Sequence, residues 1–401
     1  MERISVKLGV LLLAFGVGIT FAGVFYWSAK AEREYPWPPF VPPVEQPEHV
    51  DPNPPAKGEK VLEMVFVLDT TGSMGGLLDG AKQRIWGIVN EVMQTKSRPS
   101  VRVGLVAYRD RGDEYVTQVL PLTDDLDKVY SRLMELQAGG GGDTPEDVRK
   151  ALADGVRNAG WTPNRKGLAQ MIFLVGDAPP QEYANEPDVF ATTAEATRKG
   201  MIVNTIQCGA QADTRKVWEM IAQHGQGRYF AIAQDGGVET IETPYDQQLS
   251  DLGRQIGGTY MAYGDSATRR EMASGAAATE SSVANTAPAA AKADRALNKA
   301  LNATAYRGDL IQDVENGKTK LDELKAENLP EDLQKLAPAE RKAEIGRRID
   351  ERKKIREQIL QISKQREAFI AQKRKAGGKK AGFDSAVAAA LAEQLKKKGI
   401  N

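Results

Sequence analysis

Three oxygen-bearing side chains stand at alternate positions directly after a mostly apolar run. Asp69, Thr71 and Ser73 follow the segment Val61–Leu68, and Gly72 gives the backbone between them extra freedom. An apolar, β-branched run that stops at polar residues predicts a buried strand with ligating groups at its C-terminal end. Oxygen-only ligands suit Mg²⁺ or Mn²⁺ rather than zinc or copper. The same residue types are also ordinary turn and helix-capping residues, so the triplet alone does not decide between a metal site and a turn.

Two later stretches carry matching polar groups. The glycine run 139–142 leads to Thr144, where a helix is expected to begin, and the apolar run Met171–Val175 is followed by Gly176 and Asp177. The carboxyl ends of the strands in an α/β sheet lie along the edge where such sheets bind ligands. We therefore expect Thr144 and Asp177 to converge with the first three residues.

Together, these residues resemble the metal-ion-dependent adhesion site of von Willebrand factor A domains, of the bacterial-type, membrane-anchored kind. The resemblance implies that Thr71 and Ser73 ligate the ion directly, that Thr144 joins or leaves its shell, and that Asp69 and Asp177 act largely through bound water. Many relatives have Ser where Thr71 stands, but the hydroxyl is kept. The resemblance further implies that an Asp or Glu carboxylate of a protein partner completes the shell of a Mg²⁺ or Mn²⁺ ion.

Strand-like and helix-like patterns alternate from Glu59 to about Gly264. This alternation predicts an α/β fold: a Rossmann-like, doubly wound and mainly parallel sheet with helices on both faces. We expect residues 59–264 to form this domain, and the resemblance to the A domain covers all of it.

The composition excludes several classes of function. The 401 residues carry 54 basic and 54 acidic side chains, a balance that argues against nucleic-acid binding. Two histidines and one cysteine, Cys208, can build neither a structural zinc site nor an intramolecular disulfide.

The N-terminal region is expected to be a membrane anchor. Leu8–Trp27 is uncharged and long enough to span a bilayer, and Arg3 and Lys7 before it predict a cytoplasmic N-terminus with the bulk of the chain outside the cytoplasm. The competing interpretation is a signal peptide cleaved after Ala31, which would release a secreted protein. Residues 1–31 are thus an anchor or signal segment, and the proline-rich residues 32–58 are expected to form an extended spacer.

The C-terminal third has a different composition. Residues 265–291 are rich in Ala, Ser and Thr with few large apolar side chains, which predicts a disordered linker. Residues 292–401 are expected to form a helical tail, either a helical hairpin or a weak coiled coil, through which the chain could self-associate.

The expected function is a divalent-metal-dependent protein-binding module displayed from the membrane. The alternative is a cell-envelope scaffold that acts through the C-terminal helices, with the A domain as an accessory. A metal-dependent hydrolase is the weakest interpretation, because no histidine, cysteine or Ser-x-x-Lys group lies near the site loops to act as base or nucleophile. The sequence therefore predicts a protein that is not an enzyme.

Overall fold

The structure is a computed structural model of the 401-residue chain. It describes residues 59–94, 99–142, 146–232, 241–302, 304–376 and 383–400. The expected membrane segment Leu8–Trp27 and the proline-rich spacer 32–58 lie outside these ranges. Within the described ranges, no helix combines the length and the apolar character that crossing a membrane requires.

A six-stranded sheet forms the centre of the α/β part, with strand order β3-β2-β1-β4-β5-β6. β1 pairs in parallel with β2 and β4, β5 lies in parallel between β4 and β6, and only β3 runs antiparallel, to β2. This confirms the predicted mainly parallel sheet. The strands are β1 (Val61–Asp69), β2 (Ser100–Tyr108), β3 (Thr117–Thr123), β4 (Leu168–Gly176), β5 (Ile202–Cys208) and β6 (Gln226–Ile232).

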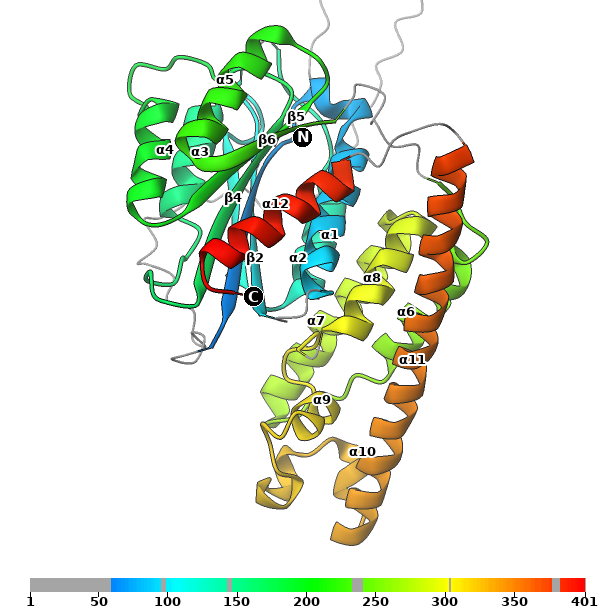
Figure 1. Ribbon diagram of the computed structural model, residues 1–401. Coiled ribbons are helices and arrows are strands. Elements are labelled where there is room, and N and C mark those ends of the chain that lie inside the picture. The colour runs from blue at the N-terminus through cyan, green and yellow to red at the C-terminus, as the bar shows by residue number, and fades with distance from the viewer. Residues whose placement is uncertain are drawn as a thin grey trace, which may run out of the picture. The chain divides into compact units, whose positions relative to one another are not determined.

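Helices cover both faces of the sheet (Figure 1). One face carries α1 (Leu78–Met93), α2 (Leu126–Glu135) and α12 (Phe383–Lys397), and the other carries α3 (Val148–Arg157), α4 (Val189–Arg198) and α5 (Ala212–His224). Alternation along β1 explains the two layers. Met64 and Phe66 belong to the first apolar core, while Val65 and Val67 belong to the second.

The C-terminal helix α12 completes the α/β part instead of belonging to a separate tail. Val387, Leu391 and Leu395 are buried in the same core as α1. Gln394 Nε2 donates a hydrogen bond of 2.8 Å to Asn204 Oδ1 of β5. The predicted domain 59–264 and tail 292–401 therefore differ from the structure, in which the last helix of the domain comes from the end of the chain.

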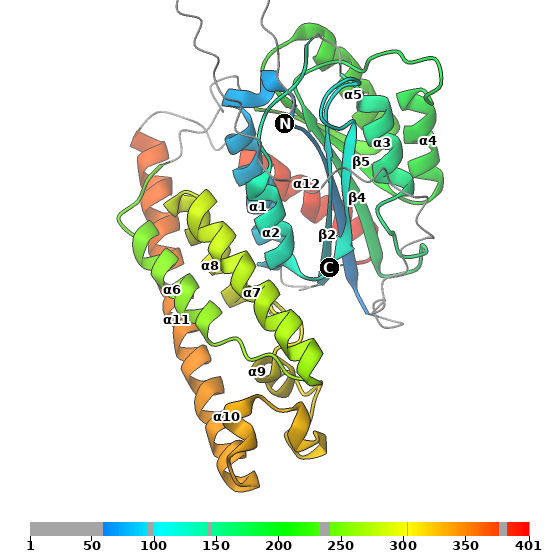
Figure 2. The same cartoon turned by 180° about the vertical axis from the view of Figure 1, so that it is seen from behind.

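The other helices form a second group, here called the helical module (Figure 2). α6 was expected to continue the α/β domain, but its apolar side chains pack against α8 and α11 in a separate core. Gly253 allows this close packing, because a Cβ atom there would lie 2.9 Å from Ala296 Cβ. The module contains α6 (Asp246–Gly258), α7 (Ser266–Thr286), α8 (Ala289–Leu301), α9 (Leu310–Glu315), α10 (Glu331–Gln334), α11 (Pro338–Ala376) and the 3₁₀ turns Leu321–Glu323 and Ala326–Asn328.

The expected disordered linker 265–291 is instead mostly the helix α7. Alanine is a strong helix former, and polar contacts replace the large apolar side chains that the segment lacks. Glu280 of α7 accepts hydrogen bonds from Arg295 and Lys299 of α8, and Arg295 also pairs with Asp127 of α2. These contacts hold α7 and α8 against the α/β part.

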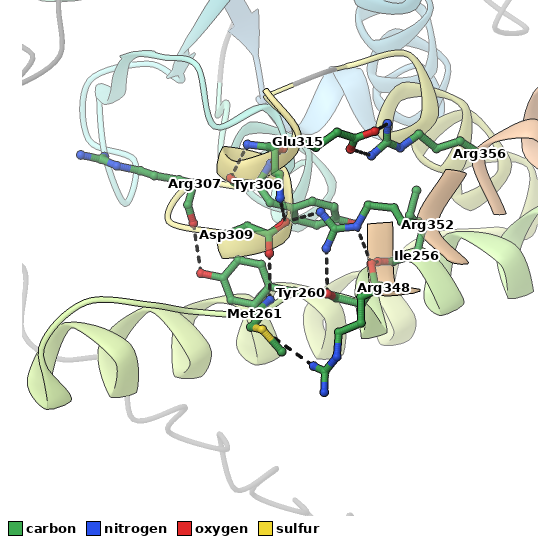
Figure 3. A network of polar contacts seen from close by, with 12 residues as sticks. Ile256, Tyr260, Met261, Tyr306, Arg307, Asp309, Glu315, Arg348, Arg352 and Arg356 are labelled. Atoms are coloured by element: carbon green, nitrogen blue, oxygen red, sulfur yellow. Dashed lines mark hydrogen bonds and ion pairs between the residues drawn. The ribbon is translucent and has the colours of Figure 1, made fainter. Parts of the chain in front are cut away.

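A buried arginine of α11 contacts both α6 and α9 within the module (Figure 3). Arg352 of α11 is 1 % exposed and forms an ion pair with Asp309 at the start of α9. Its other nitrogens donate to Thr259 Oγ1 and Thr259 O, each at 2.7 Å, at the end of α6. α11 is one continuous helix, and these contacts fix it to α6 and α9 of its own chain. The tail was expected to form a hairpin or a weak coiled coil instead.

Candidate metal centre

The first part of the site is the turn that follows β1. Asp69 is completely buried, and its Oδ1 accepts hydrogen bonds from Thr71 N at 2.9 Å and Thr71 Oγ1 at 2.7 Å. Thr71 then begins the short 3₁₀ helix Gly72–Gly76. The carboxylate thereby fixes the position of the Thr71 hydroxyl.

A chain of oxygen atoms links this turn to the end of β4. Thr71 Oγ1 lies 3.1 Å from Ser73 Oγ, which donates a hydrogen bond of 3.0 Å to Asp177 Oδ1. Close approach of the two strands makes this possible, since a Cβ atom at Gly176 would lie 2.9 Å from Asp69 Oδ2. The structure therefore brings four of the five predicted site residues together.

The glycine-rich loop lies beside this turn, as its sequence position suggested. Gly72 N donates to Gly140 O at 3.1 Å, and Gly141 N donates to Asp113 Oδ2 at 2.9 Å. Gly140 has a φ of 73°, which favours glycine, and a Cβ there would meet the Asp113 carboxylate at 2.4 Å. Thr144, the fifth predicted residue, lies outside the described residues.

The sequence interpretation missed Glu146, which is 2 % exposed and lies on the Thr71 side of the turn. A Cβ atom at Gly141 would lie 3.2 Å from both Glu146 Oε1 and Thr71 Cβ. Glu146 precedes Asp147, whose Oδ1 caps α3 by accepting from Lys150 N at 3.0 Å. The helix therefore begins at Val148 rather than at Thr144, where the sequence predicted its start. In the sequence, the one feature that could have indicated Glu146 as a site residue is its position shortly after the glycine run 139–142.

The site is strongly acidic. Burial raises the pKa of Asp69 to about 7, and burial followed by the nearby charge of Asp69 raises the pKa of Glu146 to about 8. Burial also raises the pKa of Asp177, although the hydrogen bond from Ser73 partly offsets it. A cation at this position would relieve the cost of burying these carboxylates.

The donor set fits a hard divalent cation. Asp69 Oδ2 and Glu146 Oε2 are buried without a hydrogen-bond partner in the described part of the chain. Among the described residues, no three His, Cys, Asp or Glu side chains are grouped so that they could hold a metal ion by themselves. Neutral hydroxyls would therefore have to supply part of the shell, and Thr71 and Ser73 are placed to do so.

Comparisons with known proteins agree with this architecture. Residues 63–244 match the family model described as von Willebrand factor A domain. The chain is 33 % identical over 193 residues to von Willebrand factor A domain-containing protein 7 of Rattus norvegicus, and 31 % identical over 193 residues to the Homo sapiens protein of that name. Each match covers 48 % of this chain but only 20 % of the relative. A putative ariadne-like RING finger protein of Acanthamoeba polyphaga mimivirus is 29 % identical over 33 % of this chain and 12 % of that protein.

Two solved structures are also similar, each with a TM-score of 0.34 and 16 % identity. The alignment with the SpRpn10 VWA domain covers 43 % of this chain and 88 % of that domain's chain. The alignment with the pilus adhesin SpaC of Lactobacillus rhamnosus GG, in its open conformation, covers 45 % of this chain and 29 % of the adhesin. Residues 63–244 are thus similar to von Willebrand factor A domains, and the strand order and the two helical layers agree with that family match.

Proposed function

We propose that this A domain binds Mg²⁺ or Mn²⁺ and, through the ion, an acidic side chain of a protein partner. Thr71, Ser73 and Thr144 would be the hydroxyl ligands, with Asp69 and Asp177 acting through bound water. The observation that carries the proposal is the run of oxygen atoms from Asp69 to Asp177, with neighbouring contacts of 2.7, 3.1 and 3.0 Å. Hydroxyl ligands leave the charge of the ion poorly neutralised, so an incoming carboxylate is favoured.

Binding rather than catalysis is the function that we propose for this site. Cys208 lies at the end of β5, but burial raises the pKa of its thiol, which therefore stays protonated and is a poor nucleophile. A hydrolase would need a positioned base beside the ion, and the buried carboxylates are better explained as groups that hold it.

The scaffold alternative has less support. The apolar side chains of α11 pack against α6 and α8 of the same chain. Leu360 is the one large apolar residue of α11 that is exposed among the described residues. Self-association through these helices stays a prediction, and the described residues of α11 offer no larger exposed apolar surface to favour it.

Display from the membrane is a separate part of the proposal and rests on the composition of Leu8–Trp27. N-terminal sequencing of the protein from a membrane fraction tests it. We expect the N-terminus to be retained, whereas a chain that begins at Glu32 would show that the segment is cleaved.

Calorimetric titration of the full chain with Mg²⁺ and Mn²⁺, with and without a peptide that carries one Glu, tests the binding site. We expect Ser73→Ala to weaken ion binding, because it removes one hydroxyl oxygen from the site. Ser282→Ala is the matched control, since its exposed hydroxyl donates only to Glu135 at 2.6 Å. Failure of the wild-type protein to bind either ion at millimolar concentration would leave these loops as turns and caps.

A further inference from the structure

The backbone of Glu146 is fixed independently of its side chain. Its N–H donates to Pro179 O at 3.2 Å, and its carbonyl accepts from Gln181 N at 2.7 Å. These bonds attach Glu146 to the segment that follows β4 and Asp177. The side-chain carboxylate is therefore not needed to hold the residue in place.

The carboxylate nevertheless points into the site. Oε1 lies beside Gly141, next to Thr71, and Oε2 is buried with no hydrogen-bond partner in the described part of the chain. The charges that act on it most strongly are acidic: Asp69, Asp110 and Asp113. A buried carboxylate oxygen without a donor, among like charges, is unfavourable unless a further group supplies a proton or a positive charge.

We infer that Glu146 is a positioning residue for the cation, whose free oxygen accepts a hydrogen bond from a water molecule bound to the ion. This inference rests on the proposed ion site. A role through water agrees with the geometry, because the buried Oε2 has no hydrogen-bond donor in the described part of the chain and a water molecule bound to the ion would supply one. Partners that orient the ligands of a metal commonly change its affinity by about 10- to 100-fold when they are removed.

The test compares Glu146→Gln with Glu182→Gln in the full chain. Glu182 lies in the segment that contacts Glu146, but its side chain is 86 % exposed and pairs with Arg149 at 3.4 Å. Calorimetry should show Mn²⁺ and Mg²⁺ binding about 10- to 100-fold weaker in Glu146→Gln and unchanged in Glu182→Gln. In EDTA, Glu146→Gln should melt no lower than the wild type, and its melting temperature should rise less when Mn²⁺ is added.

The outcomes separate this inference from the proposed function. Equal ion affinity in Glu146→Gln and the wild type would overturn the role of Glu146 and leave the ion site standing. An ion-free Glu146→Gln protein that melts well below the wild type would show that the carboxylate serves the fold, which also overturns the inference. Absence of ion binding by the wild type would overturn both proposals. Glu146→Asp, which keeps the charge but shortens the side chain, should bind the ion with intermediate affinity.

Discussion

Asp69 has two carboxylate oxygens in different surroundings. Oδ1 accepts two hydrogen bonds from Thr71, whereas Oδ2 is buried without a partner in the described part of the chain. The first oxygen shapes the turn, and the second, near the Tyr108 hydroxyl, is the one left for an ion or its water. Replacing Asp69 by Ala would therefore disturb the turn as well as the proposed ion site, so Ser73→Ala is the cleaner test.

The ion-free protein should lose stability as the pH rises from about 5 to about 8. The folded-state pKa values of Asp69 and Glu146 are raised to about 7 and about 8. In this window the folded protein binds more protons than the unfolded chain, so the free energy of unfolding falls with pH. The contribution is complete below the unfolded pKa values, near 4, and is lost as the pH passes through the folded ones.

Urea denaturation in EDTA at several pH values measures this dependence. Glu146→Gln should show a shallower decline than the wild type, because one of the two groups no longer titrates. Stability that rises across the same window in EDTA would contradict the raised pKa values.

At the scale of elements, α12 packs as a helix of the α/β part although α6 to α11 lie between it and β6. Its apolar face is buried against the core that contains α1. Lys398, just beyond the helix, donates to Gly200 O at 2.6 Å before β5. The helix therefore covers part of one sheet face that would otherwise be open to solvent.

Leu391→Ala should destabilise the protein by about 2–5 kcal/mol, because it leaves a cavity in a closely packed core. Leu391 is 3 % exposed. The matched control is Leu360→Ala on α11, where the side chain is 40 % exposed and the expected loss is below about 0.5 kcal/mol. Guanidinium denaturation of the full chain measures both, and equal losses would show that α12 is not part of the domain core.

At the scale of the whole molecule, the helical module is an insertion between β6 and α12 of the α/β part. The chain leaves the sheet after β6, forms α6 to α11, and returns as α12 to pack on the sheet. The module also contacts the domain, as the Arg295–Asp127 ion pair between α8 and α2 shows. Removing the C-terminal part of the chain therefore removes part of the domain.

A fragment of residues 59–264, the domain boundary expected from sequence, should not unfold cooperatively. It lacks α12 and retains α6 without its partners α8 and α11. Deletion of residues 241–376 from the full chain should instead leave a cooperatively folding domain, because the sheet and α12 remain. Thermal melting followed by circular dichroism compares the two, and a sharp transition in the 59–264 fragment would disprove the insertion.

The sequence by itself determined the sheet and most of the candidate site. Val61–Leu68, interrupted only by Glu63, and Met171–Val175 are mostly apolar runs typical of buried strands, and Asp69 and Asp177 stand at their ends. In a parallel sheet, strand ends meet at one edge, so local pattern was enough to bring these residues together. Asp69 and Asp177 lie close together because their strands run in the same direction and end at the same edge of the sheet, and no contact between distant side chains was needed to predict this.

Only the tertiary structure decided where the helices belong and which further carboxylate enters the site. The periodicity of α6 and α12 shows that each has a buried face, but not whether that face meets the sheet or another helix. α7 has few apolar side chains; its Glu280 pairs with Arg295 of α8, and Arg295 pairs in turn with Asp127, which lies 168 residues earlier in the chain. Glu146 is buried because its backbone pairs with residues 179–181. Such contacts depend on the packing of distant segments, and no local pattern in the sequence specifies them.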